Sequence, residues 1–296
     1  MSLNVFIAGD YVNAKVTEDF IDDKLLELIS NMDIAICNFE APICHENMRP
    51  IKKAGPHLCQ LFEAITKLKK IGFNCVSLAN NHIYDFGQKG LEETINELER
   101  NNILYVGAGR NFDEAYEGKI IERDKIKIGF IAACENEFGC LYEYEERGGY
   151  AWIFHPLIED KIRELKQKVD FLIFIAHAGV EDVPVPLKEW RERYRRLCDL
   201  GVDVVVGHHP HVPQGYEIYN NSLIFYSLGN FYFDTVGFEH KSDDSYSIIL
   251  ELSKNRLKDF QIIKHKKING KVCKVEDDEV SFCLENLNNL LTDNYE

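Results

Sequence analysis

The sequence predicts an α/β protein in which helices cover both faces of a sheet, and three observations support this prediction. Apolar strand-like runs alternate with amphipathic helical segments over most of the chain, as in βαβ units. The connections between these segments are short. After residue 215 the pattern changes to strand pairs of an antiparallel type. The 296 residues contain no internal repeat and no long linker, so we expect one domain over residues 1–296.

The expected elements follow one another along the chain. Short apolar runs predict strands at residues 4–9, 33–38, 74–79, 103–109, 125–133, 169–179 and 202–209. Helical spacing predicts helices at residues 18–29, 56–72, 90–102, 156–168 and 187–200. The second helix should begin at Pro56 and end before Gly72, because proline favours the first helical position and glycine the position after the last.

The C-terminal part of the chain is predicted to be antiparallel. Residues 217–229 read as a hairpin whose turn is Asn220-Asn221-Ser222. Residues 245–252 and 260–268 are further strands, and a closing helix is expected over 278–292.

Composition excludes several classes of function. The formal net charge of -15 argues against binding to nucleic acid or to an anionic membrane, because both partners are bound by clustered Lys and Arg. The chain has no run of about twenty apolar residues, and we expect neither a signal peptide nor a transmembrane segment. The nine cysteines form no Cys-x-x-Cys pair, and we expect reduced, buried thiols in a cytoplasmic protein. A removed N-terminal anchor stays open.

Polar residues gather where the predicted strands end. In layered α/β folds, ligands bind at the carboxyl ends of the strands, so side chains at several strand ends share one rim. Carboxylate, amide and imidazole groups together suit Mn, Fe or Zn better than Mg or Ca. A bridging carboxylate would hold two such ions about 3.5–4 Å apart for hydrolysis. The strand-end residues are Asp10, Asn38, Glu40, Asn80, Asn81, His82, Asp85, His177, His208, His209 and His211.

The segment His209-Pro210-His211 carries a geometric prediction. Pro210 disfavours the helical region for His209, so the tripeptide should be extended. Alternate side chains of an extended chain share a face, so His209 and His211 should point together and His208 away. Hydrogen-bonded or solvated rings are the alternative interpretation, and for His208 the two interpretations stay open.

A second pair of residues suggests proton transfer. His82 follows the strand at 74–79, and Asp85 is near enough in sequence to orient it as a general acid. The alternative is that Asn80, Asn81 and Asp85 simply make turn and cap hydrogen bonds.

The motifs together resemble those of the CapA family of capsule or poly-gamma-glutamate biosynthesis proteins, in the calcineurin-like metallophosphoesterase superfamily. They occur in the family's order within residues 1–235, and the C-terminal strands and helix would complete the fold. The matching segments are AGDYV (8–12), NFEAP (38–42), SLANNHIYDFG (77–87), VGAGRNFDEA (106–115), IAHAGVE (175–181), GVDVVVGHHPHVPQG (201–215) and FYSLGNFYFD (225–234).

The resemblance implies a four-layered α/β/β/α sandwich with mixed sheets and two divalent metal ions, Mn, Fe or Zn, at the strand ends. It implies Asp10 as a ligand of the first metal, Glu40 as the bridging carboxylate, and Asn81 and His177 as ligands of the second metal. His209 and His211 would divide between the metals, with His82 as the acid. Asn38, His208 and Asn230 would support these ligands. The sequence departs from the superfamily pattern at Val12, where a histidine ligand is usual, and at Ala178, where many family members have tryptophan.

These observations favour a metal-dependent hydrolase of phosphate esters linked to capsule or poly-gamma-glutamate metabolism. Its substrate would be an anionic small molecule or polymer. The alternative is a non-hydrolytic or amide-hydrolysing accessory protein in making or exporting such a polymer. A scaffold that kept the fold and lost the chemistry is a further alternative because of Val12, and the oligomeric state is left open.

Overall fold

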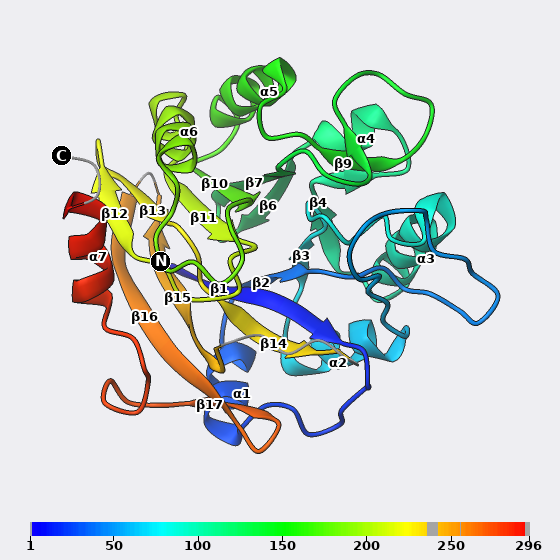
Figure 1. Cartoon of the computed structure of the whole chain (residues 1–296). Helices are drawn as coiled ribbons and strands as arrows, with labels where there is room; N and C mark the ends of the chain where they lie inside the picture. The colour runs from blue at the N-terminus through cyan, green and yellow to red at the C-terminus, as the bar shows by residue number, and fades with distance from the viewer. Residues whose placement is uncertain (1, 236–241, 255, 294–296) are drawn as a thin grey trace.

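The computed structural model describes residues 2–235, 242–254 and 256–293. Two β-sheets pack face to face in this part of the chain, and helices lie on the outer side of each sheet (Figure 1). This is the four-layered α/β/β/α arrangement with mixed sheets that the resemblance implied. The expectation of helices on both faces of one sheet is corrected, because the inner face of each sheet is covered by the other sheet.

The first sheet contains β1 (Leu3–Asn13), β2 (Ile34–Phe39), β3 (Cys75–Ser77), β4 (Leu104–Val106), β14 (Asn230–Asp234), β15 (Asp244–Ser253), β16 (Arg256–Ile268) and β17 (Lys271–Lys274). Its order is β17-β16-β15-β1-β2-β3-β4, with β14 paired to the second half of β1. β1 to β4 run parallel. β15, β16 and β17 extend the sheet antiparallel, as the sequence predicted for 245–252 and 260–268.

The second sheet contains β6 (Lys119–Arg123), β7 (Ile126–Cys134), β10 (Phe171–His177), β11 (Val204–His208), β12 (Tyr216–Tyr219) and β13 (Ser222–Phe225), in the order β12-β13-β11-β10-β7-β6. β7, β10, β11 and β13 run parallel. β5 (Ala108–Gly109), β8 (Cys140–Leu141) and β9 (Gly149–Ala151) form a small third sheet.

Alternation along β10 shows how both faces of a strand are buried. Ile173 and Ile175 belong to the core between the two sheets. Leu172 and Phe174 belong to a second core between this sheet and its helices. Successive side chains of a strand point to opposite faces, so a run without polar residues requires a cover on both sides.

The helices are α1 (Asp23–Ser30), α2 (Glu63–Ile71), α3 (Gly87–Arg100), α4 (Phe112–Tyr116), α5 (Pro156–Lys166), α6 (Lys188–Asp199) and α7 (Leu284–Asp293). α1 contacts α2 and β17, and α3 contacts β4, on the side of the first sheet (Figure 1). α5 contacts β7 and β10, and α6 contacts β11 and β13, on the side of the second. α7 is the predicted closing helix and contacts β12.

The predicted start of the second helix is wrong. α2 begins at Glu63, not at Pro56. Residues before it are held in a loop, because the Gln60 amide donates to Pro42 and the Gln60 carbonyl accepts from Cys44. The predicted end is confirmed: Gly72 follows the helix with a φ of +112°, a conformation that favours glycine.

The predicted hairpin is confirmed, but its strands span residues 216–225 and Ser222, expected in the turn, is the first residue of β13. β12 and β13 pair antiparallel from Tyr216–Phe225 to Tyr219–Ser222. Asn220 and Asn221 have φ values of +48° and +69°, as both central residues of a type I′ turn require.

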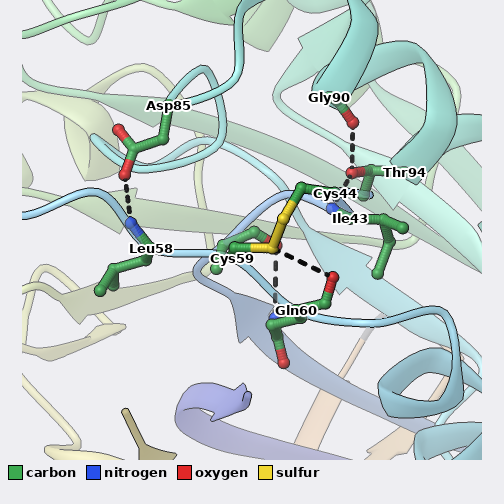
Figure 2. The surroundings of a disulfide bond; sticks show 9 residues. Ile43, Cys44, Leu58, Cys59, Gln60, Asp85, Gly90 and Thr94 are labelled. Carbon is green, nitrogen blue, oxygen red and sulfur yellow. Dashed lines mark hydrogen bonds between the residues drawn. A yellow bond between two sulfur atoms is a disulfide. The ribbon is translucent and has the colours of Figure 1, made fainter. Parts of the chain in front are cut away.

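The expectation of reduced, buried thiols is wrong at four of the nine cysteines. Cys44 and Cys59 form a disulfide, which closes the loop that precedes α2 (Figure 2). Disulfides are rare in the reducing cytoplasm, so this bond does not support the cytoplasmic location that the sequence favoured. Of the free cysteines, Cys283 is exposed and Cys273 half-buried, and the others are buried as expected. No helix in the described ranges is long and apolar enough to cross a membrane.

Candidate metal centre

The two sheets bring their parallel strand ends to one place. Asp10 and Glu40 come from the first sheet, and His177 and His211 come from the second. Glu40 and His211 illustrate the convergence. Oε1 of Glu40 and Nε2 of His211 are 3.6 Å apart, although the two residues are 171 positions apart in the sequence. The rim that the sequence predicted is therefore shared by two sheets, not formed by one.

Asp10 was expected at the end of its strand, but it lies within β1. The register of β1 with β2 and with β14 shifts next to Asp10. Gly9 makes this position possible. A Cβ atom at Gly9 would lie 1.8 Å from the carbonyl oxygen of Gly229, so only glycine lets the two backbones approach. The amide of Asp10 donates to that same carbonyl, which fixes where the carboxylate points.

A first group of potential ligands consists of Asp10, Glu40 and His211, which offer atoms within 4.8 Å of one another. All three residues are buried. Nδ1 of His211 lies 2.9 Å from Oδ1 of Asn230 and 3.4 Å from Oδ2 of Asp10. A neutral imidazole that donates from Nδ1 to Asn230 presents its Nε2 lone pair toward Glu40.

A second group consists of Glu40, His177 and His209, again within 4.8 Å. Nε2 of His177 is 3.1 Å from Nδ1 of His209 and 3.7 Å from Oε1 of Glu40. Oδ1 of Asn81 is 3.0 Å from the same Nε2 atom. Carboxylate, amide oxygen and two imidazoles thus converge on one point, and Glu40 belongs to both groups.

Electrostatics show that the two carboxyl groups differ. Burial alone would raise the pKa of Asp10, but His208 and His211 beside it hold that pKa well below its usual range. Burial and the neighbouring charge of Asp10 raise the pKa of Glu40 well above its usual range. A cation between the two carboxylates would remove the repulsion and favour ionised Glu40.

Unsatisfied buried atoms show that the residues fit a metal centre. Oε1 of Glu40 is fully buried and accepts no hydrogen bond from the described part of the chain. Buried polar atoms without a partner are rare, because their desolvation costs about 1–3 kcal/mol. Burial also lowers the pKa of His209 to about 3, so its ring is neutral at pH 7 and can donate a lone pair to a metal. The mixed oxygen and nitrogen ligands suit Mn, Fe or Zn.

Asn38 lies between the two groups. Its Nδ2 atom is 2.8 Å from Oδ1 of Asp10 and 3.1 Å from Nδ1 of His177. Its Oδ1 atom accepts from Nδ2 of Asn80, which also donates to the Phe39 carbonyl. These bonds join the end of β2 to the loop that carries Asn81.

The predicted geometry of the histidine segment is wrong. β11 ends at His208, and His209 and His211 have φ values of +97° and +57°, so the tripeptide turns instead of extending. The turn still brings the rings of His209 and His211 into the site, 5.9 Å apart. His208 does not point away. Its Nδ1 atom lies 3.1 Å from Oδ1 of Asp10. Neither ring nitrogen of His208 makes a hydrogen bond of good geometry with the described residues.

His82 and Asp85 are paired as predicted from their spacing. Oδ2 of Asp85 is 2.8 Å from Nδ1 of His82 and also accepts from the amide of Leu58. Because a carboxylate can only accept, Nδ1 of His82 carries the proton and Nε2 is left for a substrate. Lys53, which the sequence analysis did not select, forms an ion pair with Oδ1 of Asp85.

A cavity of about 150 Å³ opens beside this pair. His82, Asn81 and His211 line it from the metal side, so a substrate in the cavity would meet both the potential acid and the metal ligands. The other lining residues are Lys53, Ala54, Gly55, Pro56, Leu58, Glu137, Phe138, Glu181 and Phe233.

Three carboxylates lie near the site but are not among the residues predicted from the sequence. Glu135 and Glu137 follow β7 and group with His209, while Glu181 groups with His209 and His211. Oε1 of Glu135 lies 3.7 Å from Nε2 of His209, and burial raises the pKa of Glu135 to about 7. The strand-end rule could have found Glu135, because it is the second residue after the strand predicted at 125–133. Glu181 is the last residue of IAHAGVE (175–181), one of the segments that carry the family resemblance.

Val12 occupies the position of the usual histidine as a core residue. It is fully buried and packs in a small apolar cluster with Ala41, Leu58 and Phe233. The first metal group therefore draws its imidazole from His211, with His208 next to Asp10.

Comparisons with known proteins identify the family of this chain and agree with its fold. Residues 8–235 match the model of the family described as bacterial capsule synthesis protein PGA_cap. The chain is 32% identical over 271 residues to the PGA biosynthesis protein CapA of Bacillus subtilis (strain 168), covering 86% of this chain and 67% of that protein. It is 29% identical over 222 residues to the capsule biosynthesis protein CapA of Bacillus anthracis, covering 73% and 54%. The chain thus spans about half to two thirds of the length of these relatives.

Solved structures support the fold. A putative 5'-nucleotidase from Staphylococcus aureus, crystallised with alpha-ketoglutarate, superposes with a TM-score of 0.57 at 12% identity. The superposition covers 99% of this chain and 58% of that one. At this identity the likeness concerns the fold alone, and it agrees with the two packed sheets flanked by helices.

Proposed function

Because this chain belongs to the bacterial capsule synthesis protein family PGA_cap, we propose that it is a hydrolase of phosphate esters that binds two divalent metal ions and serves capsule or poly-gamma-glutamate metabolism. One observation carries the proposal. Oε1 of Glu40 is buried, has no hydrogen-bond donor among the described residues, and lies between His177 and His211, as a carboxylate shared by two metals would. The metallophosphoesterase fold supports the same chemistry.

The two ligand groups suggest which residue holds which metal. Asp10 and His211 would hold the first metal, and Asn81, His177 and His209 the second, with Glu40 bridging. Asn38, His208 and Asn230 would support these ligands through their contacts with Asp10, His177 and His211.

Bound at this site, two divalent ions such as Mn, Fe or Zn would polarise the phosphoryl group and activate water for attack. The chain's own residues would do the rest. His82 would protonate the leaving oxygen through Nε2, since Asp85 holds the proton on Nδ1. The negative charge of Asp85 would also stabilise the protonated imidazolium form of His82 before proton transfer.

The substrate would be an anionic small molecule or polymer. The net charge of -15 would oppose its approach at long range, but metal ions of charge +2 at the floor of the cavity would attract it locally. A nucleic-acid partner is not part of this proposal.

An accessory role without phosphoester hydrolysis is the second candidate. The relatives from Bacillus are named for biosynthesis of PGA or of capsule, not for hydrolysis. The same centre could also hydrolyse an amide, because metal-activated water attacks carbonyl carbon as well as phosphorus.

A three-substrate assay separates these functions. Protein loaded with Mn²⁺ would be tested on a p-nitrophenyl phosphate monoester, the corresponding diester and a γ-glutamyl p-nitroanilide. Turnover of a phosphate ester that disappears in His82→Ala supports the proposal. Turnover of the anilide alone supports amide hydrolysis. Metal-loaded protein that turns over none of the three, but binds poly-gamma-glutamate equally well with and without His82→Ala, would support the accessory role.

A further inference from the structure

Lys53 is a buried cation at the wall of the cavity. Its side chain is only 3% exposed and forms an ion pair with Oδ1 of Asp85. Its Nζ atom also lies 3.3 Å from Nδ1 of His82. Burying an ammonium group is costly, so a position of this kind calls for more than one favourable interaction.

The protein uses only part of the hydrogen-bonding capacity of this ammonium group. Nδ1 of His82 donates its proton to Asp85, so it cannot accept a second hydrogen bond from Lys53. An ammonium group has three donors. Asp85 accepts from it, and the ring of Phe138, whose centroid lies 5.6 Å from Nζ, faces the same charge without accepting a conventional hydrogen bond. The remaining donors are available to a group inside the cavity, which Lys53 lines.

The charges around the cavity make this cation distinctive. Among the described residues that line the cavity, Lys53 is the one lysine or arginine. Glu137 and Glu181 line the same space and would repel an anion. A substrate oxyanion that projects away from the metal ligands would therefore be attracted by Lys53 and repelled by Glu137 and Glu181.

Lys53 is presented by a loop that the disulfide closes. Residues 45–58 lie between Cys44 and Cys59 and contain no helix or strand. Two hydrogen bonds tie this loop to Asp85: Leu58 donates to its Oδ2 atom and Ile51 to its carbonyl oxygen. Figure 2 shows the disulfide and the Leu58–Asp85 bond at the same end of the loop. A covalent closure limits the conformations of such a loop more than these two bonds alone.

We propose that Lys53 binds an oxyanion of the substrate, a phosphoryl or carboxylate group, and that the Cys44–Cys59 disulfide holds the loop in the position that allows it. This inference rests on the proposed function, because it assigns a substrate contact within the same cavity. The ammonium group acts as a binding group here, so its loss weakens affinity more than it slows the chemical step.

The test compares affinities for two probes by calorimetry, inorganic phosphate and L-glutamate, on the protein as purified and after loading with Mn²⁺. Lys53→Met should weaken one probe about tenfold, whereas Lys53→Arg should stay within about threefold of wild type. Loss for phosphate identifies a phosphoryl contact, and loss for glutamate alone identifies a carboxylate contact. Unchanged affinity for both probes overturns the proposal.

Two controls separate binding from folding. Lys52→Met removes an exposed charge one residue away and should change neither affinity. Lys53→Gln keeps a polar group beside Asp85 and replaces Lys53→Met if that variant does not fold. Elemental analysis must show the same metal content in each variant. If the protein hydrolyses no phosphate ester, the proposed function fails, while the difference between Lys53→Met and wild type in probe affinity still decides the present inference.

The disulfide is tested in the same assay. Reduction, confirmed by mass spectrometry, and the double variant Cys44→Ser/Cys59→Ser should each weaken the affected probe about threefold. Neither should weaken it further in Lys53→Met, because the two changes act through one contact. Equal affinity before and after reduction overturns the role of the disulfide.

Discussion

Oε1 of Glu40 lies 3.7 Å from Nε2 of His177, and both atoms are buried where the two sheets meet. Glu40 follows β2 of the first sheet, and His177 is the last residue of β10 in the second. The candidate metal centre therefore exists only when the two sheets are packed together. Its occupancy and the stability of the fold should be coupled, since a ligand that binds only the folded state stabilises it.

Removal of metal should destabilise the wild-type protein more than a variant without the shared carboxylate. At a metal concentration 100 times the dissociation constant, binding contributes about 2.7 kcal/mol to the free energy of unfolding. A chelator should therefore lower the melting temperature of wild type more than that of Glu40→Gln, as measured by scanning calorimetry. An equal drop in both proteins would show that the stabilising metal lies elsewhere.

Substitution of the potential acid should slow turnover without removing metal. His82→Ala should reduce kcat for a phosphate ester by about 10²–10⁴-fold, the range that general acid catalysis supplies. Elemental analysis should give the wild-type metal content. His45→Ala, an exposed histidine on the disulfide-closed loop, is the matched control and should retain full activity. Wild-type kcat in His82→Ala would remove His82 from the mechanism.

Gly9→Ala should be among the most destabilising small substitutions. The added methyl group would lie 1.8 Å from the Gly229 carbonyl oxygen, so β1 and its neighbour must separate at Asp10. We expect a loss of about 3 kcal/mol in the free energy of unfolding by urea. Gly270→Ala is the control, because nothing lies within 4 Å and only its φ of +81° is unfavourable, at about 1 kcal/mol. Equal losses at the two positions would contradict the close approach of the backbones.

Acid should weaken the contact between α6 and β12. Burial alone would raise the pKa of Glu217, but hydrogen bonds from Arg195 and Arg191 lower it to about 2, from a usual value of 4.5. A lowered pKa means that the stabilisation is present above pH 4.5 and is lost as the pH falls toward 2. We expect about 1–2 kcal/mol from this group after solvent screening.

Urea unfolding at several pH values would measure this effect. Glu217→Gln should be less stable than wild type at pH 7, and the difference should shrink toward pH 2. A difference that stays constant from pH 7 to pH 2 would mean that another group is responsible.

Much of the centre was predictable because most of its residues obey one rule. Glu40, Asn81, His177, His209 and His211 lie at or shortly after the ends of parallel strands, with Asp10 inside β1 as the exception, and the structure brings all six together. Glu135 obeys the same rule, because it directly follows β7. Lys53 could not be found this way, because it lies on a loop whose path depends on distant contacts with Asp85.

The errors have local physical causes. The segment from His209 to His211 was expected to be extended because of Pro210, but tertiary contacts around Asp10 hold both histidines at positive φ. The helix expected at Pro56 starts later because pairing of Gln60 with Ile43 and the disulfide take up the preceding residues. The spacing of apolar residues along the chain carries no information about contacts with Asp10, about the pairing of Gln60 with Ile43 or about the disulfide.

The most direct test of the account is the metal content of the protein purified without chelator and supplied with Mn²⁺, measured by elemental analysis alongside Glu40→Gln. Two ions per chain in wild type, with a loss of at least one in Glu40→Gln, is the predicted result. Less than one ion per chain in wild type, or two ions in both proteins, would contradict a dinuclear centre bridged by Glu40.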